Sequence, residues 1–176
     1  EAIHLVVEGA AADRRRSLFR RDPPIDGAVT VARCRDARVE KIVDFFERLA
    51  PAELGRLAEV YAPDARFKDP FNDVRGLPAI RGIFEHMFDA LEAPRFAVTE
   101  VLVDGDQCFL GWDFRFRFRR FAAGCDQLIR GGSHLRLDAD GRIELHRDYW
   151  DAAEELYEKL PAIGALMRWL KRRATA

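Results

Sequence analysis

Strict alternation in the second half of the chain places the strongest constraint on its fold. In "GWDFRFRFRR", residues 111–120, aromatic side chains occupy every second position and charged side chains fill most of the positions between them. Successive side chains of a β-strand point to opposite sides of a sheet. The segment is therefore predicted to be a long strand with one face on a core and the other on water or a second subunit.

Four segments after Pro94 carry strand patterns of this kind, over residues 96–103, 107–121, 126–137 and 142–150. Their connections, "DGDQ", "RFAAGCD" and "DADGR", are rich in the residues of hairpin turns. Consecutive strands joined by hairpins run antiparallel. We expect a meandering antiparallel sheet.

Helical spacing dominates the chain before Pro94. Apolar residues recur at helical intervals over residues 38–50, 51–62 and 78–92, and Asp36 precedes the first run as a candidate N-cap. Pro51 and Pro78 suit first-turn positions of the second and third helices. A short strand is expected between the second and third helices, at "ARFKD". Three helices followed by a curved antiparallel sheet predict an α+β domain in which the helices close over one face.

The chain divides by composition into three parts. Residues 1–36 are rich in Ala, Arg, Gly and Asp and lack periodicity, so we interpret them as a disordered or non-native extension, with a basic partner-binding arm as the alternative. Residues 37–151 form the folded domain. Residues 152–176 are predicted to form an amphipathic helical tail that packs as a lid or dimer element.

Global composition excludes several classes of protein. The net charge of −1 does not favour nucleic acid or an anionic membrane, and no apolar run approaches the roughly 20 residues of a spanning helix. The three cysteines have no metal-type spacing and are typical of reduced thiols in a cytosolic protein. We expect a cytoplasmic protein without metal or cofactor, and a homodimer formed through the outer sheet face.

Two motifs carry a family resemblance. "YAPDARFKDPF", residues 61–71, followed by Gly76 and a helix, and "DADGRIELHRDYWD", residues 138–151, resemble the SnoaL-like and ketosteroid-isomerase-like branch of the nuclear transport factor 2-like superfamily. The resemblance covers residues 38–150. It implies a cone-shaped sheet with three helices over its concave face. The fold hosts isomerases, cyclases, hydrolases and non-catalytic proteins, so the resemblance alone assigns no activity.

Asp69 is the first candidate site residue. The resemblance implies that it is a general base, and Pro70 restricts it to extended backbone, which fixes the direction of its carboxylate. An aspartate before proline also starts turns, so the alternative is hydrogen bonding within "NDVRG", residues 72–76. The resemblance places the oxyanion donors of ketosteroid isomerases at Phe45 and Ser133. Phenylalanine cannot donate and serine is a weaker donor than a carboxylic acid, which disfavours steroid isomerisation.

The last predicted strand supplies a second candidate. Alternation in "ELHRDYWD" puts His146, Asp148 and Trp150 on one face, which the family pattern turns inward, and the first two form an acid–base couple. "RDYWD" also resembles the "RDYFD" segment of limonene epoxide hydrolase, whose first aspartate helps to position a water and corresponds to Asp148. The Arg-x-Asp half of that site is not matched. A polar pair that serves structure is the alternative.

These observations predict a pocket for a small, largely apolar molecule, with Asp69, His146 and Asp148 as acid–base groups of an isomerase, cyclase or hydrolase type of enzyme. A non-catalytic ligand-binding or accessory homodimer is the alternative. The expected pocket residues are Phe45, Phe84, Met87, Phe88, Trp112, Phe114, Phe116, Ser133 and Trp150.

Overall fold

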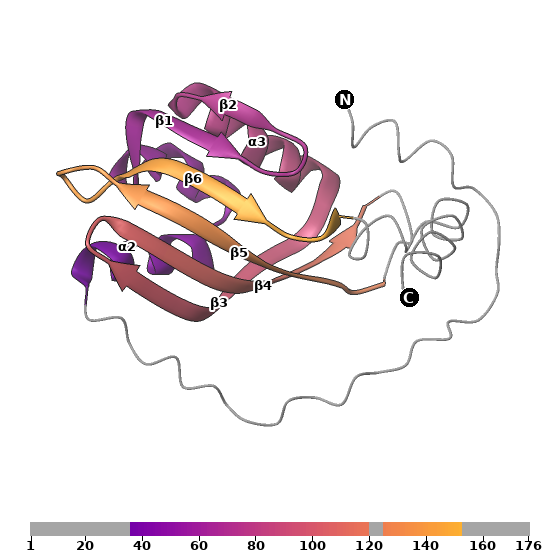
Figure 1. Ribbon diagram of the computed structural model, residues 1–176. Helices are drawn as coiled ribbons and strands as arrows, with labels where there is room; N and C mark the ends of the chain where they lie inside the picture. Colours follow the sequence, from indigo (N-terminus) through magenta and orange to yellow (C-terminus); the bar gives the residue numbers. More distant parts are fainter. Residues whose placement is uncertain (1–35, 120–124, 153–176) are drawn as a thin grey trace, which may run out of the picture.

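A computed structural model describes residues 36–119 and 125–152 of the 176-residue chain. The predicted N-terminal extension lies outside these residues apart from Asp36, and the predicted C-terminal tail lies outside them apart from Ala152. The described part is one α+β unit in which helices cover one side of a strongly curved sheet (Figure 1). The predicted fold class is confirmed.

The sheet contains six strands in the spatial order β2-β1-β6-β5-β4-β3. Their bounds are β1 Tyr61–Lys68, β2 Asp73–Arg75, β3 Leu91–Asp104, β4 Gln107–Phe118, β5 Gln127–Leu137 and β6 Ile143–Tyr149. The four strands from β3 to β6 form an antiparallel meander, as the turn sequences predict. Two of the turns contain glycines with positive φ, Gly105 and Gly141, a conformation that side chains with a Cβ disfavour.

One pairing differs from the prediction, because β1 runs parallel to β6. Hairpin turns dictate antiparallel pairing only between neighbouring strands, whereas about 75 residues that include α3 and four strands separate β1 from β6. The sheet is therefore mixed. The pairing brings His146 opposite Phe67, so the parallel contact places the last strand beside the Tyr61 strand at the site described below.

Three helical segments cover the concave face: α2 Ala37–Glu47, the 3-10 helix η1 Pro51–Glu59 and α3 Leu77–Ala90. The Asp36 side chain accepts a hydrogen bond from Arg38 N, which caps α2 as predicted. Glu47 Oε1 accepts from Val98 N at 2.9 Å and ties the end of α2 to β3. The second segment has 3-10 rather than α geometry, a tighter winding than its apolar spacing predicts.

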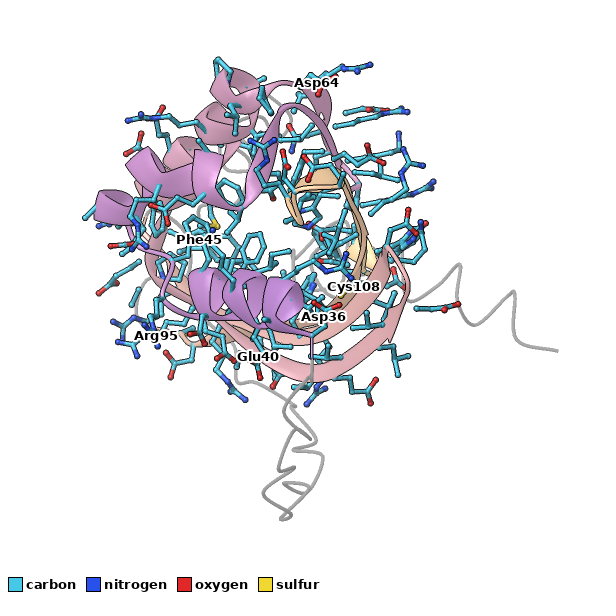
Figure 2. All side chains as sticks on the ribbon, turned by 90° about the vertical axis from the view of Figure 1, so that its left-hand side faces the viewer. Asp36, Glu40, Phe45, Asp64, Arg95 and Cys108 are labelled. Atoms are coloured by element: carbon cyan, nitrogen blue, oxygen red, sulfur yellow. The ribbon has the colours of Figure 1, made fainter. Side chains whose placement is uncertain are left out.

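The hydrophobic core lies between these helices and the sheet. Val39 and Ile42 of α2, Ile80 of α3, and Leu135 and Ile143 of the sheet are all at most 1% exposed. Figure 2, viewed along the strands, shows the sheet curving around the interior side chains, while the labelled Glu40, Asp64 and Arg95 lie at the periphery. This curvature leaves space inside the cone that the core does not completely fill.

Candidate functional site

A small cavity lies inside the cone between α2, α3 and the sheet. Its volume is about 40 Å³. Its walls are mostly apolar, and its polar groups come from neighbouring positions on β5 and β6. The lining residues are Phe46, Phe67, Phe84, Phe96, Val98, Leu110, Trp112, Ser133, His146 and Asp148.

The polar groups of the cavity belong to one hydrogen-bonded network. Tyr61 Oη lies 2.5 Å from His146 Nδ1, and His146 Nε2 lies 2.8 Å from Asp148 Oδ1. The Ser133 hydroxyl is 2.5 Å from the same carboxylate oxygen. Trp112 Nε1 donates to Ser133 Oγ at 2.9 Å. Pairing of β5 with β6 sets Ser133 opposite Asp148, which explains why these side chains meet.

The protons of this network can be assigned from the Tyr61 hydroxyl. Tyr61 is fully buried, and burial raises its pKa well above the ordinary value, with the charge of Asp148 adding to the rise. The hydroxyl keeps its proton, and His146 Nδ1 is its one partner among the described residues. We therefore assign Tyr61 as the donor and the Nε2–H tautomer to His146, which donates in turn to Asp148.

Two of these donors then converge on one atom. His146 Nε2–H and the Ser133 hydroxyl both donate to Asp148 Oδ1, and Ser133 Oγ accepts from Trp112. An ionised carboxylate oxygen is an acceptor only and can take both of these hydrogen bonds. Asp148 Oδ2 has no hydrogen-bond partner in the described part of the chain, and the Asp148 side chain is 16% exposed. This oxygen is the acceptor that the network leaves available.

Asp69 is not part of this site. Its Oδ1 accepts from Phe71 N at 2.7 Å and Asn72 N at 2.6 Å, and the Asn72 side-chain amide donates to both of its oxygens. It does not line the cavity. These hydrogen bonds support the turn alternative for Asp69, because they engage both of its carboxylate oxygens.

Six other residues expected in the pocket pack beside the cavity rather than lining it. Trp150 contacts Phe71, with ring centroids 5.5 Å apart, and Phe114 stacks on Phe96 at 4.3 Å. Alternation predicts the inward face of β4 correctly, but Phe114 and Phe116 lie further along the strand than Trp112. The remaining three, Phe45, Met87 and Phe88, pack against the core. Phe84, Trp112, Ser133, His146 and Asp148 do line the cavity.

Sequence reasoning missed the remaining walls and the buried tyrosine. Phe46 neighbours Phe45 on α2, and it was the family resemblance that placed Phe45 rather than Phe46 at the site. The Tyr61 contact with His146 joins residues 85 positions apart in the chain. Since it depends on the parallel pairing of β1 with β6, no local pattern could have indicated it.

Two adjacent glycines of β5 make room for rings on opposite faces of the sheet. A Cβ on Gly131 would lie 2.4 Å from the Trp112 indole inside the cone. A Cβ on Gly132 would lie 2.3 Å from the Phe109 ring on the outer face. Gly131 is therefore what allows Trp112 to lie against the sheet and reach Ser133.

The sequence matches the family described as SnoaL-like domain over residues 42–146, more than half of the chain. The chain belongs to the SnoaL-like domain family. The match spans every structural element from within α2 to within β6, so the cavity of this SnoaL-like domain lies between elements of the family core. No curated protein sequence matches the chain.

Solved structures with the same fold share little sequence with this SnoaL-like domain. A protein with a ketosteroid isomerase-like fold from Catenulispora acidiphila, in complex with trimethylamine, has a TM-score of 0.59 at 19% identity and covers 72% of this chain and 95% of its own. A putative polyketide cyclase from Acidithiobacillus ferrooxidans has a TM-score of 0.61 at 15% identity, covering 72% and 96%. An LEH-like epoxide hydrolase from M. tuberculosis has a TM-score of 0.55 at 16% identity, covering 76% and 93%. These similarities establish the fold.

Two further observations concern the described residues of the SnoaL-like domain. They contain no group of three or more His, Cys, Asp or Glu side chains placed to hold a metal ion. Within the same residues, no helix is both long enough and apolar enough to span a membrane.

Proposed function

We propose that this SnoaL-like domain binds a small, largely apolar molecule in the cavity and that Asp148 accepts a proton from it. The observation that carries the proposal is the convergence of the Ser133 and His146 donors on Asp148 Oδ1, which leaves Oδ2 of this cavity-lining residue without a hydrogen-bond partner in the described part of the chain. A positioned carboxylate in a mostly apolar site is a general base. His146 is a positioning residue, because both of its ring nitrogens are engaged.

Proton transfer is a better match to this site than water-driven epoxide opening. The arginine and aspartate nearest to the epoxide hydrolase pattern, Arg115 and Asp113, pair with each other at 3.2 Å and do not line the cavity. No cationic side chain is among the lining residues that the structure describes. An isomerase or cyclase type of reaction, started by Asp148, is therefore the form of catalysis that we favour.

The size of the cavity favours a small ligand. A volume of about 40 Å³ lies well below the roughly 300–1,000 Å³ of pockets that hold drug-sized ligands. The Catenulispora protein, which was solved with trimethylamine, supports a small ligand in this fold. A polyketide or steroid would require the walls to move apart.

A second candidate is a ligand-binding protein without turnover. The observation that favours it is that the cavity lining described by the structure offers no spare donor: the Ser133 hydroxyl, Trp112 Nε1–H and His146 Nε2–H are all directed within the network. A reaction that develops an oxyanion needs such a donor, and losing one costs roughly 3 to 4 kcal/mol of barrier in established sites. The two candidates differ in whether Asp148 changes a bound molecule.

The test is incubation of the purified protein in D2O with a small-molecule extract of its source cells, followed by mass spectrometry. Proton transfer by Asp148 predicts a compound that gains deuterium with the wild type and not with Asp148→Asn. Asp69→Asn is the matched control, because Asn can still accept the turn amides, and it should behave as the wild type. Equal incorporation by the wild type and Asp148→Asn would contradict catalysis by Asp148. A compound retained unchanged by the wild type would favour the binding protein.

A further inference from the structure

The described lining residues of the cavity leave a hydrogen-bond acceptor available but no donor. Each side-chain N–H or O–H group of the lining residues donates within the network, namely those of Trp112, Ser133 and His146. The group that remains is Asp148 Oδ2, which can only accept while the carboxylate is ionised. A ligand that brings an acceptor would find no donor among these residues. A ligand that brings a donor would find one acceptor.

The described lining residues also carry a negative charge, that of Asp148, without a cationic side chain. Asp148 pairs with His146, which carries no charge in the assigned tautomer, and the lining residues that the structure describes include no Lys or Arg. A partly buried carboxylate is costly unless a positive group compensates it. The cation is therefore expected from the ligand rather than from the lining.

The walls suit a cation with an apolar surface. Five aromatic side chains surround the space, and the faces of such rings attract cations within about 6 Å of the ring centroid. Val98 and Leu110 add only hydrocarbon. A strongly hydrated inorganic ion would lose its water shell here without replacement oxygens, whereas alkyl groups gain from contact with the rings. The aromatic residues are Phe46, Phe67, Phe84, Phe96 and Trp112.

We propose that the ligand of this cavity is a small alkylammonium ion, whose N–H group donates to Asp148 Oδ2 while its alkyl groups contact the aromatic rings. The inference rests on the ionised Asp148 of the proposed function and names the ligand class of that site. A small ion is expected because the cavity volume, about 40 Å³, is well below the roughly 300–1,000 Å³ of pockets for drug-sized ligands.

The test compares two probes of the same shape. Isopropylammonium and propan-2-ol have equal numbers of heavy atoms, and each can donate a hydrogen bond, but only the first is charged. Binding is followed by the NMR resonance of the Trp112 indole N–H, which lies in the cavity wall. The ammonium should bind at least about tenfold more tightly than the alcohol to the wild type, since tenfold corresponds to a modest ion-pair contribution. Equal affinities would overturn the proposal.

Two variants test whether Asp148 causes the preference for the charged probe. Asp148→Asn should remove the preference for the ammonium, and Asp69→Asn should keep it. A preference that survives in Asp148→Asn would overturn the proposal, because the cation would then bind elsewhere. If Asp148→Asn does not fold, nuclear Overhauser contacts from the isopropyl methyls to Phe84 and Trp112 in the wild type decide instead, and their absence at saturating ammonium counts against the site.

Failure of this inference is distinguishable from failure of the proposed function. Suppose that deuterium incorporation depends on Asp148 but the two probes bind equally well. Asp148 would then still be the general base, and the cationic ligand would be excluded. If the domain binds the ammonium selectively but no compound gains deuterium, the ligand is an alkylammonium ion and the domain is a non-catalytic binding protein.

Discussion

Among single residues, the Tyr61 hydroxyl determines how the site is arranged. It is buried, and it contacts His146 Nδ1 at 2.5 Å, so it sets which imidazole nitrogen carries the proton and thereby which atom faces Asp148. Phe46 and Phe67 pack against the same imidazole, with ring centroids 5.6 and 4.8 Å away. His146 is thus held by packing on its faces and by hydrogen bonds at its edges.

Tyr61→Phe is therefore expected to destabilise the fold by about 1–3 kcal/mol, because it leaves His146 Nδ1 buried without its donor. The measurement is the free energy of unfolding in urea. Tyr149→Phe is the matched control, since Tyr149 is 47% exposed and its ring contact with Arg147 survives the change. A Tyr61→Phe protein as stable as the control would show that the hydroxyl is not a structural donor.

The raised pKa of Tyr61 also predicts a loss of stability at alkaline pH. In the unfolded chain a tyrosine ionises near pH 10, whereas the folded protein holds Tyr61 protonated to higher pH. The unfolded state therefore binds fewer protons above about pH 10, and stability falls as pH rises through that range. Tyr61→Phe should lose less stability than the wild type between about pH 9 and pH 11. A steeper decline in the variant would contradict this assignment.

Among the structural elements, β5 is the one on which the geometry of the cavity depends most. Gly131 and Gly132 face opposite sides of the sheet, and each gives space to a ring of β4. The two rings differ in how tightly the surrounding residues confine them. Trp112 is 8% exposed and hydrogen-bonded to Ser133, whereas Phe109 is 38% exposed on the outer face.

Gly131→Ala should consequently be more harmful than Gly132→Ala, although the chemical change is identical. Displacement of the confined indole is expected to cost about 1–3 kcal/mol, as overpacking commonly does, while Phe109, on the face that the helices leave open, is less confined within its own subunit. Urea unfolding of both variants measures the difference, and the Trp112 indole N–H resonance should shift only in Gly131→Ala. Equal free energies of unfolding for Gly131→Ala and Gly132→Ala would mean that the Trp112 indole is not confined by its contact with β5.

Considered as a whole molecule, the domain presents apolar side chains on the face of the sheet that the helices leave open. Leu102, Phe109 and Tyr149 are 65%, 38% and 47% exposed. Strand pairing sets Leu102 opposite Phe109, which places both on neighbouring strands of one face. We propose that two copies pair through this face, which is the role that the sequence predicts for it.

Phe109→Asp should then shift the protein from dimer to monomer, because a symmetric interface would bury the new carboxylate twice. Light scattering at micromolar concentration measures the mass. Glu40→Gln, on the exposed side of α2, is the control and should leave the mass unchanged. A monomeric wild-type protein would refute the proposed dimer.

The sequence predicts the parts of this fold that depend on neighbouring residues. Alternation and hairpin turns indicate β3 to β6, and helical spacing with Asp36 indicates α2. The parallel β1 and β6 pair is non-local, so neither its direction nor the Tyr61 contact could be predicted. Asp69 remained ambiguous because an Asp-Pro pair is compatible with both a base and a turn. Alternation gave the inward face of β4 but not the depth at which the cavity ends, which is why Phe114 was expected in its wall.

The central claim is that Tyr61 donates a hydrogen bond to His146 and that His146 donates one to an ionised Asp148. A neutron crystal structure of the protein at neutral pH, without added ligand, tests it most directly by locating the deuterons. We predict a deuteron on Tyr61 Oη directed at His146 Nδ1, a deuteron on Nε2, and none on either oxygen of Asp148. A deuteron on Nδ1 or on the Asp148 carboxyl group would contradict the assignment, and with it the carboxylate that both the proposed function and the ligand class require.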